Sequence, residues 1–490
     1  MRALHKPTQA ERWGVFELAL EGPPSGNPFV DVQVSARFAK GAKRYEVEGF
    51  YDGDSIYKLR FMPQEEGAYT YETFSDVPGL NGIKGEFICT PAASGNRGPV
   101  AVEDSGGFRY ADGTRYIPIG TACSDWHLQS EQLQEQTLDT LRTSPFNKLR
   151  MCVFPSARVF EDAEPSLCPF AARPERGFDL TRFNPQYFSR LEKRIQDLSS
   201  LGIEAELVLF HPYDEGRWGF DRMSAEEDER YVRYVIARLA AFNNVWWSLA
   251  NDFDAFKDKT TEHWDALFSI VQECDHAGHL RSIHSGGETL YDYGKPWVTH
   301  ASIQSEDVRK ISKWVRHYGK PVIVDDSGSE GNLHTPWGSL TPEEMTLRMW
   351  EGVFRGGFVA HGETYFRSDQ ALWRTHGGAL QGRSVERIAF LRKVLEEAPD
   401  GIRYSGNRLD ASTLEIAGEY YLQYLGPHRF LYREFVLPDG RYKVDIIDTW
   451  NMTVTVAGES AGGRLRVDLP AQLYYALRIR KVPTTERTEE

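Results

Sequence analysis

The sequence predicts an α/β protein in which a (β/α)8 barrel of the TIM type is flanked by two antiparallel β-sandwich domains. Short runs with strand-like patterning fill roughly the first ninety residues, and they return after about residue 404. Between these two regions, strand-like and helix-like segments alternate about eight times, which is the order of a parallel barrel. We therefore expect three domains, at residues 1–95, 96–403 and 404–490.

The amino-terminal domain is predicted from period-two patterning. Between Val30 and Phe38, apolar residues occupy the even positions and polar residues occupy most of the odd ones. This alternation is typical of a strand with one buried face. Similar short runs follow at 45–51, 57–61 and 69–74. The stretch 91–107 is rich in Ala, Ser, Gly and Pro and predicts a linker to the next domain.

The middle region predicts the barrel. Its expected strands are Tyr116–Gly120, Lys148–Phe154, Glu204–Phe210, Val245–Ala250, Ser282–His284, Val298–Ile303, Val322–Asp326 and Gly357–His361. Helical patterns lie between or after them at 186–200, 226–242, 262–276, 307–318, 342–354 and 384–397. No Gly-x-Gly-x-x-Gly follows a strand and no P-loop is present, which disfavours an enzyme that uses a dinucleotide or a nucleoside triphosphate.

The carboxy-terminal region again predicts antiparallel strands. They are expected at 420–425, 430–437, 442–448, 452–457, 464–469 and 474–480. The tripeptide Pro438-Asp-Gly440 marks a tight turn between two of them. The simplest interpretation is a second β-sandwich.

Composition limits the partners and the compartment. The chain has 490 residues, of which 57 are basic and 71 acidic, and its formal net charge of −14 repels phosphate backbones and anionic lipids. We therefore expect no nucleic-acid partner and no membrane partner. The five cysteines are widely spaced and include no Cys-x-x-Cys, which disfavours disulfides and structural zinc. No apolar segment follows the amino terminus, so we expect a cytoplasmic protein, and no cofactor is predicted.

Nearly every predicted barrel strand has a polar or titratable side chain at or near its end. Active sites of such barrels are built at the carboxyl ends of the strands, so these side chains are expected to converge there. The residues that we expect to bind substrate are His127, Arg150, His211, Trp218, Asn251, His284, Gln304 and His361.

Three carboxylates, Asp252, Asp326 and Glu363, are the catalytic candidates. Asp252 and Asp326 follow the fourth and seventh strands and are expected to face each other across the barrel mouth. Glycoside hydrolysis needs two carboxyl groups that flank the scissile bond. We assign Asp252 as the general acid, kept protonated by an apolar setting, and Asp326 as the nucleophile or general base. Asp326 is expected to be held ionised by donors such as His300 or Arg150.

Three longer strings support this interpretation. They are Val245-Trp-Trp-Ser-Leu-Ala-Asn-Asp-Phe-Asp254, Lys320-Pro-Val-Ile-Val-Asp-Asp326 and Gly356-Gly-Phe-Val-Ala-His-Gly-Glu-Thr364. With them the chain resembles the retaining glycoside hydrolases of clan A, which carry Asn-Glu after strand 4 and Glu after strand 7. It is more closely similar to bacterial glycoside-hydrolase-like proteins with a DUF5060 sandwich, a DUF4038-type barrel and a DUF5605 carboxy-terminal domain. This resemblance covers nearly the whole chain and implies a glycosidase.

The sequence departs from that pattern at both carboxylates. The resemblance implies Glu at positions 252 and 326, whereas this chain has Asp at both. Each missing methylene withdraws a carboxylate by roughly 1.3–1.5 Å, so a retaining gap of ~5–5.5 Å widens to about 8 Å, within the inverting range. Three explanations stay open: the backbone moves inward, the enzyme inverts with a water between the carboxylates, or Glu363 replaces one Asp.

Two other classes are weighed against the two-carboxylate glycosidase. One is a metal-dependent TIM-barrel sugar isomerase or hydrolase, with ligands drawn from His127, His211, His284, His300, His361, Asp214 and Glu363. The other is a barrel that binds carbohydrate without cleaving it. For the glycosidase, the absence of an export signal predicts exo-action on short oligosaccharides or glycosides already inside the cell. A homo-oligomer is left open.

Overall fold

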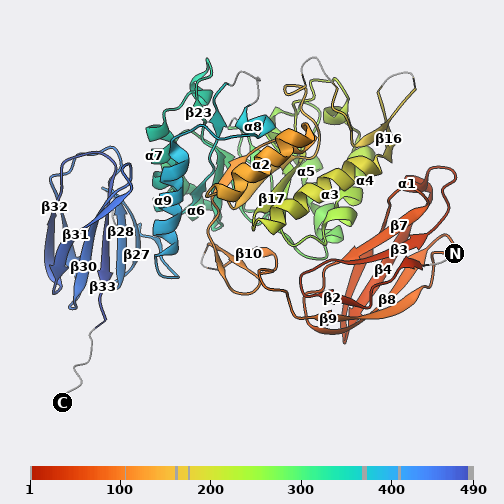
Figure 1. The fold of residues 1–490 in the computed structure, drawn as a ribbon, viewed down its shortest axis with the longest axis horizontal. Helices are drawn as coiled ribbons and strands as arrows, with labels where there is room; N and C mark the ends of the chain where they lie inside the picture. The colour runs from red at the N-terminus through yellow and green to blue at the C-terminus, as the bar shows by residue number, and fades with distance from the viewer. Residues whose placement is uncertain are drawn as a thin grey trace.

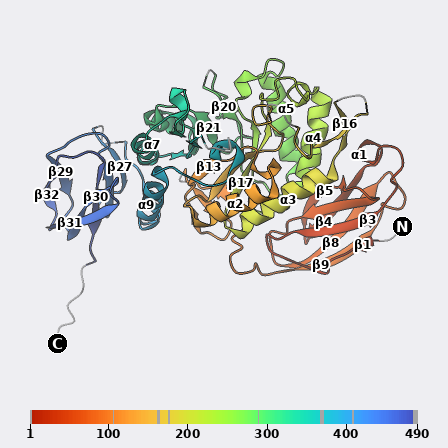
Figure 2. The ribbon, with the colours of Figure 1, turned by 45° about the horizontal axis from the view of Figure 1, so that its top comes forward.

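The computed structural model describes residues 3–104, 106–160, 164–174, 177–287, 289–366, 372–406 and 410–483. Figure 1 shows an amino-terminal β-domain in red, a central domain of strands and helices, and a carboxy-terminal β-domain in blue. The view turned by 45° in Figure 2 shows the same order, with the central domain between the two β-domains. The two β-domains therefore pack on different sides of the central domain.

The amino-terminal domain consists of two sheets, with strand orders β1-β3-β7-β6 and β2-β9-β8-β4-β5. Aromatic side chains fill the space between them; for example, the Phe38 ring stacks on that of Phe61 with centroids 4.4 Å apart. The strands are β1 (Ala3–His5), β2 (Gln9–Glu11), β3 (Phe16–Glu21), β4 (Val34–Lys40), β5 (Lys43–Glu48), β6 (Phe50–Tyr51), β7 (Ile56–Phe61), β8 (Gly67–Ser75) and β9 (Lys84–Thr90).

The prediction of a strand from Val30 onward is wrong at its start. Residues Pro28–Asp31 form the short helix α1, and strand β4 begins only at Val34. Pro28 occupies the first turn, where its fixed φ suits a helix and its missing N–H costs nothing. Val30 is consequently 43% exposed instead of facing the core.

Buried ion pairs join the amino-terminal domain to helices α3 (Pro185–Ser200) and α4 (Ala225–Leu239) of the central domain. Arg238 of α4 is fully buried and donates to Glu192 Oε1 and to Asp52 Oδ1, each at 2.7 Å. Arg60 of β7 reaches the same Glu192 carboxylate at 2.8 Å. Removing one partner would leave an uncompensated buried charge, so these contacts hold the two domains together.

The segment predicted as a linker is partly folded. Strand β10 (Val100–Val102) pairs with β11 (Phe108–Tyr110), which pairs with β12 (Arg115–Tyr116). Val100, Phe108 and Tyr116 pack against Trp246. This small sheet covers the amino-terminal end of the central strands. The first predicted strand, Tyr116–Gly120, is accordingly split between β12 and β13 (Gly120–Ala122).

The central strands form two parallel arcs, with orders β13-β14-β17-β18-β19 and β20-β21-β22-β24. Only Ile283 separates β19 from β20, and a parallel bridge pairs Thr121 with His361. The strands after β13 are β14 (Lys148–Cys152), β17 (Glu204–Phe210), β18 (Val245–Ala250), β19 (Arg281–Ser282), β20 (His284–Ser285), β21 (Ala301–Gln304), β22 (Val322–Asp326) and β24 (Phe358–Val359). Two short pairs lie outside the arcs: β15 (Phe170–Ala172) with β16 (Phe178–Phe183), and β23 (Glu330–Gly331) with β25 (Glu363–Thr364).

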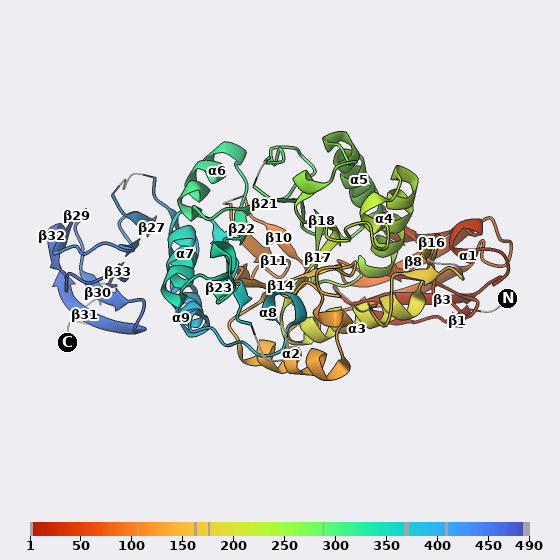
Figure 3. The ribbon, with the colours of Figure 1, turned by 90° about the horizontal axis from the view of Figure 1, so that it is seen from above.

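Helices surround these strands, as the view from above in Figure 3 shows. Besides α3 and α4 they are α2 (Glu131–Thr143), α5 (Thr261–Cys274), α6 (Ile311–Tyr318), α7 (Pro342–Phe354), α8 (Trp373–His376) and α9 (Ser384–Glu396). The residue pattern did not predict helix α2. Its amino-terminal cap is Ser130, whose hydroxyl accepts the Leu133 N–H at 3.3 Å.

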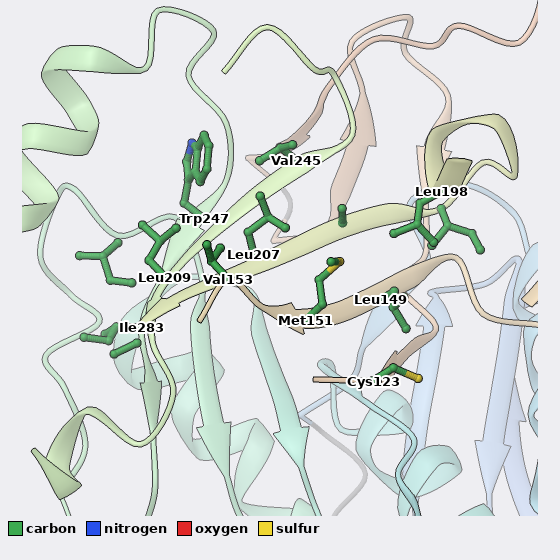
Figure 4. Close-up of a cluster of buried hydrophobic side chains, with 14 of the residues drawn as sticks. Cys123, Leu149, Met151, Val153, Leu198, Leu207, Leu209, Val245, Trp247 and Ile283 are labelled. Atoms are coloured by element: carbon green, nitrogen blue, oxygen red, sulfur yellow. The ribbon is translucent and has the colours of Figure 1, made fainter. Parts of the chain in front are cut away.

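An apolar layer fills the space between strands and helices. Figure 4 shows Leu149 and Met151 from β14 beside Leu207 and Leu209 from β17. All four side chains are fully buried. Because side chains alternate along a strand, their neighbours in sequence point to the opposite side, into the space enclosed by the arcs. That inner side is polar, as the residues of the site show.

The carboxy-terminal domain contains a sheet of order β26-β27-β28-β33-β30-β31 and a pair, β29-β32. Tyr424 packs on Trp350 of helix α7, with ring centroids 5.4 Å apart, and so attaches the domain to the central one. The strands are β26 (Arg403–Tyr404), β27 (Ser412–Ile416), β28 (Tyr420–Tyr424), β29 (Tyr432–Leu437), β30 (Tyr442–Asp448), β31 (Thr453–Ser460), β32 (Gly463–Asp468) and β33 (Tyr475–Lys481). Strands β26 and β27 were not predicted.

None of the helices in the described ranges combines the length and the apolar character that crossing a lipid bilayer requires.

Candidate active site

Asp252 lies directly after strand β18, at the carboxyl-terminal edge of the central strands. Its backbone adopts a left-handed conformation with φ of 44°, which is uncommon for a residue other than glycine. The parallel pairing of β18 with β17 continues up to this point, as the hydrogen bond from Asn251 N–H to Phe210 O at 2.9 Å shows. The sharp turn at Asp252 then directs the carboxylate away from the strand, and such strained residues cluster at functional sites.

Two neighbours bind the Asp252 carboxylate. Oδ1 lies 3.0 Å from Nδ1 of His284, and Oδ2 accepts the hydroxyl of Tyr213. Burial raises the pKa of this carboxyl, but the hydrogen bonds and the positive charge of His284 outweigh that effect and lower the pKa to about 2. The prediction of an apolar setting that keeps Asp252 protonated is therefore wrong for the protein without substrate. The reason is that the strand-end neighbours of Asp252 are donors, not apolar side chains.

Tyr213 is itself held in place by several partners. Its hydroxyl accepts from Asn251 Nδ2 at 2.5 Å, and its backbone N–H donates to Nδ1 of His211 at 3.2 Å. The other ring nitrogen of His211 lies 3.0 Å from Phe154 O, and the His211 and Tyr213 rings stack with centroids 5.3 Å apart. The Arg158 guanidinium covers the Tyr213 ring at 4.4 Å. His211 thus acts on the candidate site through Tyr213.

Asp326 ends strand β22, on the other arc. The register between β21 and β22 shifts there, so that Gln304 pairs with Asp326 immediately after Ile303 pairs with Val324. Because side chains alternate along a strand, the adjacent residues Asp325 and Asp326 have different environments. Asp325 points into the enclosed space and binds Lys148 at 2.8 Å. Gln304 is half-buried beside this step.

Three donors bind the Asp326 carboxylate. Arg374 donates to Oδ2 at 2.7 Å, the Trp337 indole donates to Oδ1 at 2.9 Å, and Gly328 N–H donates to Oδ1 at 3.1 Å. The Arg374 guanidinium also lies over the Trp337 ring at 4.3 Å. The expectation that His300 or Arg150 donates to Asp326 is wrong, since Arg150 binds Glu206 and Asn251 instead. His300 precedes β21 and packs against Trp246 and Phe108 at the opposite end of the strands.

Arg150 connects the two carboxylate environments. From strand β14 it donates to Asn251 Oδ1 at 2.9 Å, and its guanidinium lies 3.7 Å from Asp325 Oδ2. These two residues immediately precede Asp252 and Asp326. Cys152, two residues further along the same strand, is close enough to both Asp252 and Arg374 for their charges to influence its pKa, which burial raises. Asp252 follows β18 of one arc and Asp326 ends β22 of the other, so both lie at the carboxyl-terminal edge of the central strands.

Glu363 is bound mainly by backbone amides of the loop before α9. Both of its carboxylate oxygens accept backbone N–H groups at 2.7 Å, Oε1 from Gln381 and Oε2 from Gly382. Neighbouring Glu330 binds the next two amides, of Arg383 and Ser384, at the start of helix α9. A side chain at Gly382 would place its Cβ 2.6 Å from Oε2 of Glu363. Glu363 thus stabilises the loop before α9.

Within the described residues, no hydrogen bond, ion pair or ring contact joins His127, His361 or Trp218 directly to Asp252 or Asp326. His127 and His361 are almost completely buried, and burial lowers the pKa of each to about 3. His361 stacks on Phe146, with centroids 4.9 Å apart. Trp218 is also buried, and its indole donates to Glu164 at 2.7 Å.

Sequence reasoning assigned no contact with the carboxylates to Tyr213, Trp337 or Arg374. Tyr213 lies in His211-Pro-Tyr-Asp214, directly after a predicted strand, so its position was a signal for it. Arg374 lies on α8, well beyond the last strand, and no spacing connects it with Asp326. Within the described ranges, no group of three or more His, Cys, Asp or Glu side chains has the arrangement of a metal site.

Comparison with protein families assigns all three parts of the chain. Residues 105–399 match the model described as "Apiosidase-like, catalytic domain", which covers more than half of the sequence. The chain belongs to this apiosidase-like family. Residues 9–76 and 409–480 match two domains of unknown function, DUF5060 and DUF5605. The resemblance expected from the sequence is thereby confirmed, and the central region is a glycosidase-like catalytic domain.

Solved structures agree with the family. A protein from Bacteroides vulgatus ATCC 8482, presumed to be a glycoside hydrolase, is 40% identical with a TM-score of 0.91; the match covers 97% of this chain and 100% of the other. A family 5 glycoside hydrolase from the same strain is 16% identical with a TM-score of 0.62 and coverages of 79% and 94%, which shows a shared fold. Among curated proteins the apiosidase-like chain has no match.

Proposed function

We propose that this apiosidase-like protein hydrolyses glycosidic bonds with Asp252 and Asp326, and that its two parallel arcs form one closed (β/α)8 barrel. The support for closure lies at the two seams. One residue separates β19 from β20, and at the other seam His361 N–H donates to Gly120 O at 2.8 Å. On this interpretation the two flanking β-domains are sandwiches, with boundaries near residues 95 and 403.

The observation that carries the proposal is the pair of bound carboxylates at one edge of the strands. Glycoside hydrolysis requires two carboxyl groups, one to protonate the leaving oxygen and one to act as nucleophile or to activate water. Asp326 accepts a charge-assisted hydrogen bond from the Arg374 guanidinium at 2.7 Å. We therefore assign it as the nucleophile or general base.

We assign Asp252 as the general acid, a role that requires it to gain a proton when substrate binds. Its pKa of about 2 means that it is ionised at neutral pH in the protein without substrate. It gains a proton only when a bound sugar displaces a donor or excludes water, both of which raise the pKa of a carboxyl. Its side chain is 21% exposed, so a sugar can reach it. We expect activity to increase toward acidic pH for this reason.

The substrate is proposed to be a short oligosaccharide or glycoside, cleaved from its end. The family description names an apiosidase, so glycosides with a terminal apiose belong in the first panel of substrates. Aryl glycosides and oligosaccharides of other sugars complete it. Release of internal fragments from a long polymer would contradict exo-action, and retained activity in EDTA is expected because the mechanism uses no metal.

The stereochemical outcome is the decisive measurement once a substrate is found. NMR of the first product distinguishes a retaining enzyme, in which Asp326 forms a glycosyl intermediate, from an inverting enzyme, in which a water lies between the carboxylates. Failure of Asp252→Asn and Asp326→Asn to reduce turnover would exclude this pair as the catalytic machinery.

A further inference from the structure

Asp125 is a buried carboxyl next to the candidate active site. It follows strand β13, directly precedes the short 3₁₀ helix Trp126–Leu128, and has no part exposed to solvent. Oδ1 accepts the Ser156 N–H at 2.8 Å, and Oδ2 accepts the Ser124 hydroxyl at 2.5 Å. One side chain thus joins the loop after β13 to the loop after β14. The mechanism proposed above does not use it.

The backbone beside Asp125 holds helix α8. Asp125 N–H donates to Thr375 O at 2.8 Å, and Ser124 N–H donates to Arg374 O at 2.9 Å. Ser124 O in turn accepts the Cys152 N–H of strand β14 at 2.8 Å. Residues 124 and 125 therefore lie at the crossing of three segments: the loop after β13, the end of β14 and helix α8.

Helix α8 supplies the cation that binds Asp326. Arg374 donates to Asp326 Oδ2 at 2.7 Å, and its guanidinium lies over Trp337, the second side-chain donor to the same carboxylate. The backbone carbonyl of Arg374, the residue that carries this guanidinium, accepts the Ser124 N–H, and the next carbonyl accepts the Asp125 N–H. A shift of the loop after β13 would thus move Arg374 relative to Asp326.

The geometry points to Asp125 as a positioning residue, which fixes the segment carrying Arg374 so that its guanidinium is aligned with Asp326. This inference rests on the proposed role of Asp326. The buried Ser156 N–H needs an acceptor at this point, and the Asp125 carboxyl supplies it while its other oxygen binds the Ser124 hydroxyl. Burial raises the pKa of Asp125 to about 7, against the opposing hydrogen bonds from Ser124 and Ser156, consistent with a carboxyl enclosed by protein.

The test is a double-mutant cycle between Asp125 and Arg374. Asp125→Ala alone should lower kcat about 10- to 100-fold with little change in KM, because small misplacements of a catalytic group carry costs of this size. In an Arg374→Ala background the same substitution should change kcat less than about twofold, because its effect passes through Arg374. Asp125→Asn keeps one acceptor and a polar group of equal size, so it should restore most of the rate.

A matched control is Glu204→Gln, since Glu204 is equally enclosed but lies at the amino-terminal end of strand β17. It should leave kcat unchanged. Independent, multiplicative effects of Asp125→Ala and Arg374→Ala would overturn the inference, as would an Asp125→Asn variant as slow as Asp125→Ala. If Asp125→Ala does not fold, Asp125→Ser takes its place, since its shorter side chain cannot replace both acceptors.

A crystal structure of the Asp125→Ala or Asp125→Ser protein separates this inference from the proposed function. Arg374 should no longer lie within hydrogen-bond distance of Asp326, whatever the activity of the protein. An unchanged Arg374–Asp326 pair would overturn the positioning role even if the enzyme were slower. Conversely, a displaced Arg374 together with full activity of Asp326→Asn would retain the structural role and exclude the proposed function.

Discussion

Each arc of the central domain carries one aspartate of the candidate pair, Asp252 after β18 and Asp326 at the end of β22, and the two are bound in different ways. On the first arc, Asp252 is bound by a hydroxyl and an imidazole, and its side chain is 21% exposed. On the second, Asp326 is bound by a guanidinium and an indole and is 7% exposed. A guanidinium keeps its charge at any pH at which proteins fold, whereas an imidazole and a hydroxyl can exchange protons. Asp326 is therefore paired with a permanent positive charge, whereas Asp252 is held by partners that can exchange protons.

The largest expected effect comes from removing either carboxylate. Asp252→Asn and Asp326→Asn should each lower kcat by roughly 10³-fold or more, while product binding survives because the surroundings are intact. Steady-state kinetics and calorimetric titration with product measure the two quantities. Near-normal turnover in either variant would contradict the assignment of one catalytic carboxylate to each arc.

The second prediction sharpens the comparison by changing the donors on Asp252. Tyr213→Phe removes the hydroxyl that lowers the pKa of Asp252, so that pKa should rise. Because a general acid acts only when protonated, the alkaline limb of the kcat/KM profile should move to higher pH. Tyr293→Phe is the matched control: Tyr293 is a buried tyrosine that bonds to Ser285 and Ser302 instead. A shift in the control but not in Tyr213→Phe would contradict the assignment.

The third prediction concerns Glu363, which lies outside the comparison. Glu363→Ala leaves the amides of Gln381 and Gly382 without acceptors, so the free energy of unfolding should fall by about 1–3 kcal/mol. The loss of turnover should be far smaller than for either Asp. Denaturant unfolding measures the first effect, with exposed Glu386→Gln as control. A loss of turnover as large as that of Asp326→Asn, without loss of stability, would make Glu363 the missing catalytic carboxylate.

The smallest expected effect lies at the opposite end of the strands. Burial raises the pKa of Glu204 to about 8, although the Trp246 indole, which donates to it at 2.9 Å, opposes the shift. Ionisation is therefore harder in the folded than in the unfolded chain, so stability should fall as pH rises from about 4.5 to 8. Glu204→Gln should flatten this decline by an amount on the order of a few kcal/mol. An unchanged slope in thermal unfolding would show that Glu204 is not the titrating group.

The sequence located the strands that bear the site better than it located the contacts within the site. Strands β17, β18 and β22 were predicted at their exact bounds, because long buried apolar runs have few alternative interpretations. The register shift between β21 and β22, which pairs Gln304 with Asp326, cannot be recognised in the residue pattern. The environment of Asp252 was predicted incorrectly, because it depends on a hydroxyl and an imidazole from two other strands. Such contacts depend on three-dimensional register, which no local pattern encodes.

The buried ion pairs between the amino-terminal domain and helices α3 and α4 have a consequence for dissecting the protein. Family comparison divides the chain into three separate units, which invites expression of residues 105–399 alone. Such a fragment would expose Arg238 and Glu192 without Asp52 and Arg60, their partners on the missing domain. It would also uncover the apolar surface that Phe50 covers. We therefore expect the amino-terminal and central domains to unfold together, and a fragment that keeps both to be more stable than residues 105–399 alone.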